Sequence, residues 1–158
     1  MKKWHAAIVA MVFVFAIAIA GTVKAETIQS DIAVTRADIQ ADRQAIVADS
    51  MKLADAQATA FWPVYRNYRA ELAKLGDRTV KLVTDYATNY DTLTDAQASS
   101  LTTEFLSIQK DTLKVKEKFV PKFNAVLSPK LVMRFFQIEN KLDTILMIDA
   151  VDGIPLAK

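Results

Sequence analysis

The segment Leu93-Thr94-Asp95-Ala96-Gln97 constrains the fold of this chain more than any other. Thr94 can accept a hydrogen bond from the backbone N–H of Gln97, and the Gln97 side chain can accept one from the backbone N–H of Thr94. This reciprocal arrangement, a capping box, begins a helix. The turn-forming residues Asn89-Tyr90-Asp91-Thr92 come just before it. We therefore expect one helix to end and the next to begin here.

Apolar residues on both sides of this segment follow alternating steps of four and three, the pattern of a helix paired lengthwise with another. The first run extends from Ala54 to Tyr90 and the second from Asp95 to Val126. Two long helices joined by a short turn are typical of antiparallel neighbours. Pro63 and Pro121 lie inside the runs and are expected to bend them, because proline removes a backbone donor. The seam predicted for the second run comprises Leu101, Phe105, Ile108, Thr112, Val115, Phe119 and Val126.

Two further segments resemble the start of a helix. Leu53-Ala54-Asp55-Ala56-Gln57 has the glutamine of a capping box, but alanine stands at the cap position. Leu127-Ser128-Pro129 places serine at the N-cap and proline at the first helical position, where its missing N–H costs nothing. A C-terminal helix is therefore expected to follow. The predicted helix-cap residues are Leu53, Gln57, Leu93, Thr94, Gln97, Leu127, Ser128 and Pro129.

No strand-like alternation of useful length appears in the sequence. The predicted fold is all-α, a long bent antiparallel helical hairpin with additional N-terminal and C-terminal helices. We expect three parts: a signal peptide over 1–25, an N-terminal amphipathic helix or arm over 26–50, and a helical hairpin domain over 51–158.

Residues 1–25 have the pattern of a secretory signal peptide. Lys2 and Lys3 precede the uncharged apolar run Ala6–Ala20, and Val23-Lys24-Ala25 offers a cleavage site that makes Glu26 the new N-terminus. The run is shorter than the roughly 20 residues that a membrane span needs. We therefore expect a periplasmic product, cleaved after Ala25 and without a stable membrane span, although an uncleaved anchor is the alternative. The chain has no cysteine, so disulfides and lipid attachment to an N-terminal cysteine are excluded.

Residues 26–50 carry five acidic residues against two arginines, a net charge of −3. Ile32, Ile39 and Ile46 recur every seven residues and form a narrow apolar stripe suited to packing on another helix. Two interpretations are open. The segment is either a solvated amphipathic helix, or an acidic helix that lies against a basic face of this fold or of a partner.

The residues needed for most enzyme chemistry are missing. The only histidine, His5, lies in the predicted signal peptide, so the usual zinc, copper and haem ligands are absent from the mature chain. Catalysis by a Ser-His or Cys-His pair and a glycine-rich phosphate loop are likewise unavailable. Loss of Lys2, Lys3 and Lys24 leaves 17 basic residues against 18 acidic ones, which argues against nucleic-acid binding. We predict a protein that is not an enzyme, with no cofactor and no metal.

Aromatic and basic residues gather near Pro63, Pro121 and Pro129. Most of the aromatics are expected to form the core, but Phe61-Trp62 and Phe135-Phe136 are adjacent pairs whose members cannot both face one seam. The lysines are either ordinary surface charges or an electropositive face for acidic partners. The residues of this candidate partner-binding surface are Phe61, Trp62, Tyr65, Lys114, Lys118, Phe119, Lys122, Phe123, Phe135 and Phe136.

The capping segments resemble the repeated Leu-Thr-x-x-Gln motif of the Spy/CpxP family of periplasmic helical proteins. Leu93–Gln97 matches the motif outright, Leu53–Gln57 matches except at Ala54, and Phe123–Pro129 is similar to the second motif region except that Leu131 replaces a glutamine. The resemblance covers about Met51 to Leu146. It implies bent hairpins that dimerise into a cradle and act as ATP-independent chaperones or envelope-stress proteins, while the family's histidine-rich metal segments have no counterpart here.

These observations predict an exported, non-enzymatic helical protein that binds other proteins, either unfolded clients or an envelope protein, with a homodimer among the implied assemblies. The alternative is a structural or regulatory helical module with one specific envelope partner and no general chaperone activity.

Overall fold

The computed structural model describes residues 39–151 and 154–157. The predicted signal peptide and the first part of the segment 26–50 lie outside these residues. The described residues form helices and connections and contain no strand, which confirms the all-α prediction. Residues 39–51 are helical, and the later elements are α3 (Asp55–Asn89), the short 3-10 helix η2 (Tyr90–Thr92), α4 (Asp95–Asn124) and α5 (Pro129–Val151).

The chain divides into two compact units. The hairpin unit spans Leu53–Val132 and contains α3, η2 and α4. The terminal unit contains the helix 39–51 and most of α5, from Met133 onward.

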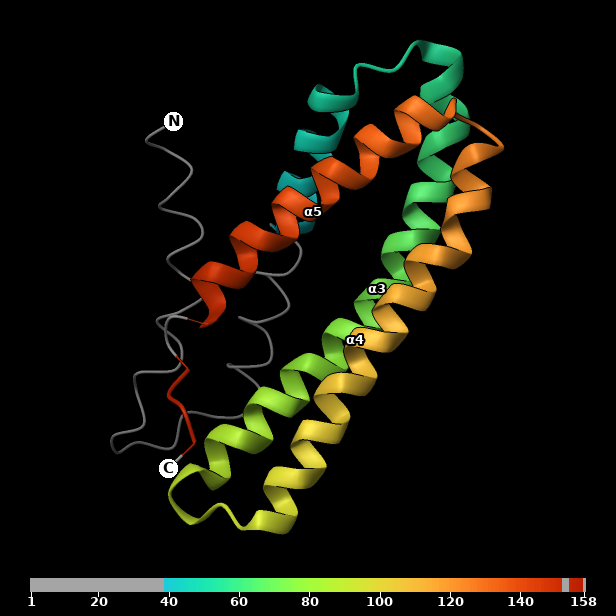
Figure 1. Ribbon diagram of the computed structural model, residues 1–158. Coiled ribbons are helices and arrows are strands. Elements are labelled where there is room, and N and C mark those ends of the chain that lie inside the picture. The colour runs from blue at the N-terminus through green and yellow to red at the C-terminus, as the bar shows by residue number, and fades with distance from the viewer. Residues whose placement is uncertain (1–38, 152–153, 158) are drawn as a thin grey trace. The chain divides into compact units, whose positions relative to one another are not determined.

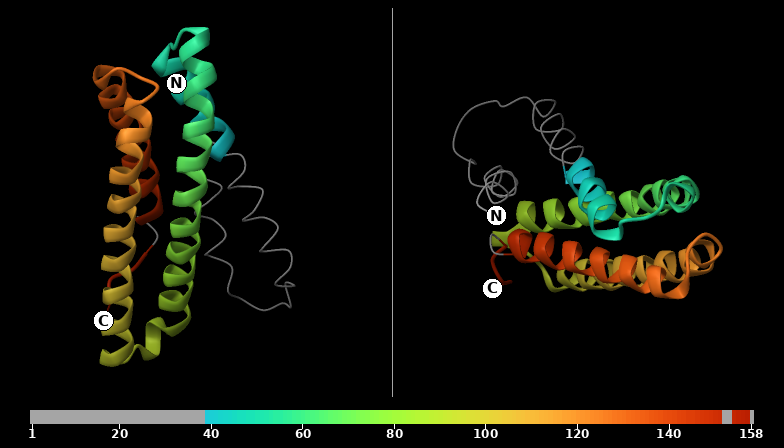
Figure 2. Two further views of the ribbon diagram at one scale, coloured as in Figure 1. Left: turned by 90° about the vertical axis from the view of Figure 1, so that its right-hand side faces the viewer. Right: turned by 90° about the horizontal axis from the view of Figure 1, so that it is seen from above.

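In the hairpin unit, α3 and α4 lie side by side along their length (Figure 1; Figure 2, left), and Figure 1 shows both curving in the same direction. The ring centroid of Phe61, near the start of α3, is 5.7 Å from that of Phe123, near the end of α4. Further along α3, Arg78 contacts Glu104 in the first half of α4. This order of contacts makes the pair antiparallel, as predicted. Both helices continue through their internal prolines, Pro63 and Pro121.

The turn between α3 and α4 is built by the predicted capping box. The Gln97 N–H donates to Thr94 Oγ1 at 3.3 Å, and the Thr94 N–H donates to Gln97 Oε1 at 2.9 Å. Gln97 Nε2 also donates to Asn89 Oδ1 at 3.3 Å, which ties the start of α4 to the end of α3. At the start of α3 only half of the box exists: the Ala54 N–H donates to Gln57 Oε1 at 3.3 Å, and alanine has no oxygen to return the bond.

Replacing Thr94 with alanine is expected to lower the free energy of unfolding by about 1 kcal/mol, because the Gln97 N–H at the start of α4 loses its side-chain acceptor. Thr103→Ala, in the middle of the same helix, is the matched control and should be neutral or slightly stabilising. Urea unfolding followed by circular dichroism measures both. An equal effect of the two substitutions would show that the cap is not what Thr94 contributes.

The start of α5 follows the predicted pattern. The carbonyl oxygen of Ser128 accepts hydrogen bonds from the N–H groups of Leu131 and Val132, at 2.9 and 3.0 Å, and Pro129 is the first helical residue. Leu127 and Val132 are both buried on either side of this cap, the placement expected of a hydrophobic staple.

The terminal unit is held by a buried ion cluster that the sequence did not predict. Arg43 on the helix 39–51 is 3% exposed and reaches two carboxylates of α5. Its NH1 lies 3.0 Å from Glu139 Oε2, and its NH2 donates to Asp143 Oδ1 at 2.7 Å. Val47 and Met51, one and two turns after Arg43, are also buried. At least residues 39–51 therefore form a packed amphipathic helix rather than a solvated one.

Candidate protein-binding surface

Most aromatic residues of the predicted partner-binding surface are buried, and those on α3 and α4 form the core of the hairpin unit. Phe61, Tyr65, Phe119 and Phe123 are at most 1% exposed. Phe61 and Tyr68 of α3 meet Phe119 and Phe123 of α4 with ring centroids 5.4 to 5.7 Å apart. In the terminal unit Phe135 is also fully buried. The prediction that Phe61, Tyr65, Phe119, Phe123 and Phe135 form a partner-binding surface is therefore wrong, because burial leaves no ring face for a partner.

The second members of the two adjacent aromatic pairs are only half buried. Trp62 packs edge-on against Phe61 and Tyr65, with centroids 5.1 and 5.3 Å away. Phe136 lies 5.2 Å from Phe135. Neighbours on a helix point about 100° apart, so one of each pair faces the interior and the other its edge. Of the aromatic residues in the predicted surface, only Trp62 and Phe136 are partly exposed.

The three predicted lysines are tied to groups of their own unit. Lys118 Nζ donates to both carboxylate oxygens of Glu71 on α3, at 2.8 and 2.9 Å, and Lys114 Nζ donates to Asp111 Oδ1 at 2.9 Å. Lys122 Nζ lies over the ring of Phe119, 4.2 Å from its centroid. Lys118 thus joins α4 to α3, and Lys122 covers the ring of Phe119 on its own helix.

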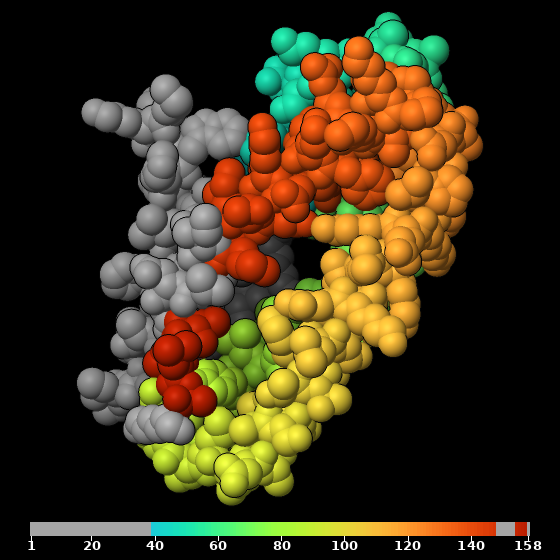
Figure 3. Space-filling model, viewed as in Figure 1, coloured from blue at the N-terminus to red at the C-terminus, as the bar shows by residue number. Residues whose placement is uncertain are grey.

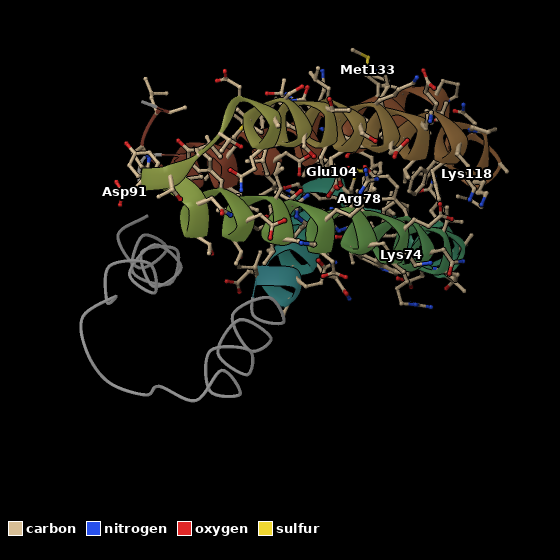
Figure 4. All side chains as sticks on the ribbon, turned by 90° about the horizontal axis from the view of Figure 1, so that it is seen from below. Lys74, Arg78, Asp91, Glu104, Lys118 and Met133 are labelled. Atoms are coloured by element: carbon tan, nitrogen blue, oxygen red, sulfur yellow. The ribbon has the colours of Figure 1, made fainter. Side chains whose placement is uncertain are left out.

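A second bridge between the helices is centred on Arg78, a residue that the sequence did not single out. Its guanidinium donates to both oxygens of Glu104, at 2.8 and 3.1 Å, to Asp111 Oδ2 at 2.8 Å and to Ser107 Oγ at 3.0 Å. Figure 4 shows Arg78 and Glu104 pointing toward one another from the two helices. Because a planar guanidinium fits carboxylates in few orientations, this bridge favours one register of the two helices.

Three carboxylates in these bridges have a lowered pKa. Hydrogen bonds from Arg78 lower the pKa of Glu104 and Asp111, and the hydrogen bond from Lys118 lowers that of Glu71. A carboxylate with a depressed pKa in the folded state stabilises the fold above its ordinary pKa, 4.5 for glutamate and 3.8 for aspartate. That stabilisation is lost as the pH falls through the folded-state value.

We therefore expect the stability of the hairpin to fall as the pH is lowered below about 4.5. In Arg78→Gln this decline should be shallower, because Glu104 and Asp111 both lose the guanidinium of Arg78, although Asp111 keeps its hydrogen bond from Lys114. Arg66→Gln, an exposed arginine on the same helix, should keep the wild-type slope. Thermal unfolding from pH 3 to pH 7 measures the slope, and parallel curves for Arg78→Gln and the wild type would contradict the prediction.

Large apolar side chains are exposed on another side of α4. Leu106, Leu113 and Val120 are 56%, 57% and 37% exposed and recur every seven residues. We call these three residues the α4 stripe. Phe105, placed in the buried seam by the sequence pattern, is 47% exposed and lies beside the stripe. In Figure 3, α4 (yellow to orange) lies at the surface along its length.

The side chains of the α4 stripe are aliphatic, so they can pack against another apolar surface. Helix faces with an apolar residue at every seventh position seat the side chains of a second helix. The described residues hold no group of three or more histidine, cysteine or acidic side chains placed to bind a metal ion. None of the described helices has the length and apolar content that crossing a membrane requires.

No protein-family model, no curated protein and no solved structure matches this chain significantly.

Proposed function

We propose that this is an exported, non-enzymatic helical protein that binds other proteins, in the manner of the ATP-independent chaperones and envelope-stress proteins of the Spy/CpxP type that its capping motifs resemble. The observation that carries the proposal is the exposed α4 stripe. Three large apolar side chains in one row on a hairpin, with Phe105 beside them, are the kind of surface that soluble proteins keep for a partner.

The internal ion pairs support this assignment. Arg78 and Lys118 connect α4 to α3 without covering the stripe, so the hairpin is closed on one side and open on the other. Because the aromatic cluster supplies the core, the stripe is not needed to fold the unit. Its apolar residues are therefore free to be selected for binding.

The test is whether purified mature protein suppresses aggregation of a model unfolded client. We expect stoichiometric protein to slow light scattering, and the double substitution Leu106→Gln with Leu113→Gln to remove most of the effect. Both sites are exposed and glutamine is a good helix former, so the fold should persist. Met133→Gln, which removes a 64% exposed apolar side chain on α5, is the matched control. Absence of suppression at equimolar amounts would reject the chaperone function.

The alternative is a structural or regulatory module with one specific envelope partner. The seven-residue spacing of the α4 stripe favours it, since such a seam seats one helix at a time. A photo-crosslinking residue at position 113 distinguishes the two functions in cells. One stoichiometric adduct supports the single partner, and many adducts of different mass support a general chaperone.

Export itself is tested by the mass of the mature chain. We expect a first residue of Glu26 and recovery from the periplasm. A product that keeps residues 1–25 and sediments with membranes would support the anchored form instead.

A further inference from the structure

The α4 stripe has the dimensions of a short helical seam. Residues seven apart on an α-helix differ by only about 20° in direction, so Leu106, Leu113 and Val120 form one row. At about 1.5 Å per residue the row is roughly 21 Å long. Its three members are all more than a third exposed. The side chains of one partner helix can therefore pack against the row at three successive positions.

The charges beside this row are mainly positive. At about 100° per residue, Lys110 and Lys114 fall on one flank and Lys116 on the other, and Glu117 is the only acidic residue among the neighbours. The ammonium of Lys114 is bonded to Asp111 but its side chain is 60% exposed. Lys118 and Lys122 lie farther round the helix, toward Glu71 and Phe119, and do not belong to the flanks.

We infer that the partner of the α4 stripe is an amphipathic α-helix of another protein, apolar at every seventh residue and acidic beside that row. The inference rests on the proposed function and names the class of its partner. The apolar residues would interdigitate with Leu106, Leu113 and Val120, and the flanking carboxylates would face Lys110, Lys114 and Lys116.

The narrowness of the row favours a helix over an anionic membrane surface. Helices that lie in a membrane interface present a broad apolar face with bulky residues across it. Here the apolar row is one residue wide for most of its length, with Gln109 and Lys116 on one side and Lys110 and Glu117 on the other. A single facing helix can fill such a row, whereas acyl chains would contact the lysine stems as well.

The experiment uses the purified protein and a fluorescent 21-residue helical peptide with leucine at every seventh position and glutamate on both flanks. We expect anisotropy to report binding that weakens with salt, and Leu113→Gln to weaken it roughly tenfold or more. Lys110→Glu should weaken it about threefold to tenfold. The controls Met133→Gln and Lys130→Glu, exposed sites on α5, should bind like the wild type.

Several results would overturn the inference. An acidic helix would be excluded if a matched peptide with lysine flanks bound as tightly. It would also be excluded if vesicles of phosphatidylglycerol and phosphatidylcholine bound the wild type but not Leu113→Gln, while the acidic peptide did not bind. A dimer in sedimentation that Leu113→Gln dissociates would place a second copy on the stripe. If the protein suppresses aggregation through Leu106 and Leu113 but does not prefer the acidic peptide, this inference is wrong and the proposed function stands. If the protein neither suppresses aggregation nor binds the peptide, the proposed function is wrong as well.

Discussion

Replacing Arg43 with methionine is expected to destabilise the packing of the helix 39–51 against α5 by about 3–5 kcal/mol. The methionine fills much of the space but takes the guanidinium of Arg43 away from the carboxylate of Glu139, whose side chain is 1% exposed. Removing one member of a buried pair is costly because the remaining charge keeps its desolvation penalty. Amide hydrogen exchange measures the effect directly, and residues 39–51 should exchange roughly a hundredfold faster or more.

Two variants separate the ion cluster from simple loss of side-chain volume. Adding Glu139→Met to Arg43→Met should restore most of the protection, since both buried charges are then replaced by apolar groups, and Asp143, 37% exposed, reaches water. Arg134→Met, an exposed arginine on α5, should change the exchange little. Exchange in α3 and α4 serves as an internal reference. Unchanged protection of residues 39–51 in Arg43→Met would show that the cluster does not hold the helix.

The interactions that the sequence could predict are local. The capping box joins Thr94 to Gln97 within three residues, and the proline at the start of α5 acts at its own position, so their geometry follows from the residue types alone. Arg43 shows the limit of such reasoning. Its partner Asp143 is 100 residues away, and nothing near Arg43 distinguishes it from a surface charge.

The four-three pattern placed the helices correctly but not the direction of every side chain. Phe105 and Phe119 both fit the predicted seam, two heptads apart, yet Phe119 is fully buried and Phe105 is 47% exposed. Over two heptads a straight helix drifts by about 40° from a seven-residue repeat. The drift alone does not decide burial, because Phe123 lies about 40° from Phe119 in the same direction and is fully buried. The α4 stripe was not predicted either, because none of its residues belongs to the predicted seam.

The candidate surface was misplaced for a related reason. Aromatic residues near the prolines suggested a binding face, but a hairpin of two helices has few positions where large rings can be enclosed. Phe61, Tyr68, Phe119 and Phe123 fill those positions with mutual ring contacts. Besides the half-buried Trp62 and Phe136, the apolar surface that remains on the hairpin is the α4 stripe, whose aliphatic residues no motif marks in the sequence.

The cluster makes Phe119→Ala the substitution with the largest expected effect on the hairpin unit, about 3–5 kcal/mol in the free energy of unfolding. The ring is fully buried, lies 5.4 Å from that of Tyr68 and 6.2 Å from that of Phe123, and is covered by Lys122. Its removal leaves a cavity between α3 and α4 and also exposes the neighbouring rings to solvent.

Phe105→Ala is the matched control, because it makes the same chemical change in the interior of the same helix. Its ring is 47% exposed, so the loss should be no more than about 1 kcal/mol. Urea unfolding of both variants, followed by circular dichroism, gives the comparison. Equal losses would mean that the hairpin does not distinguish its buried aromatic face from its open one. In that case the exposed apolar ring beside the α4 stripe would stabilise the fold itself and would need no partner to explain it.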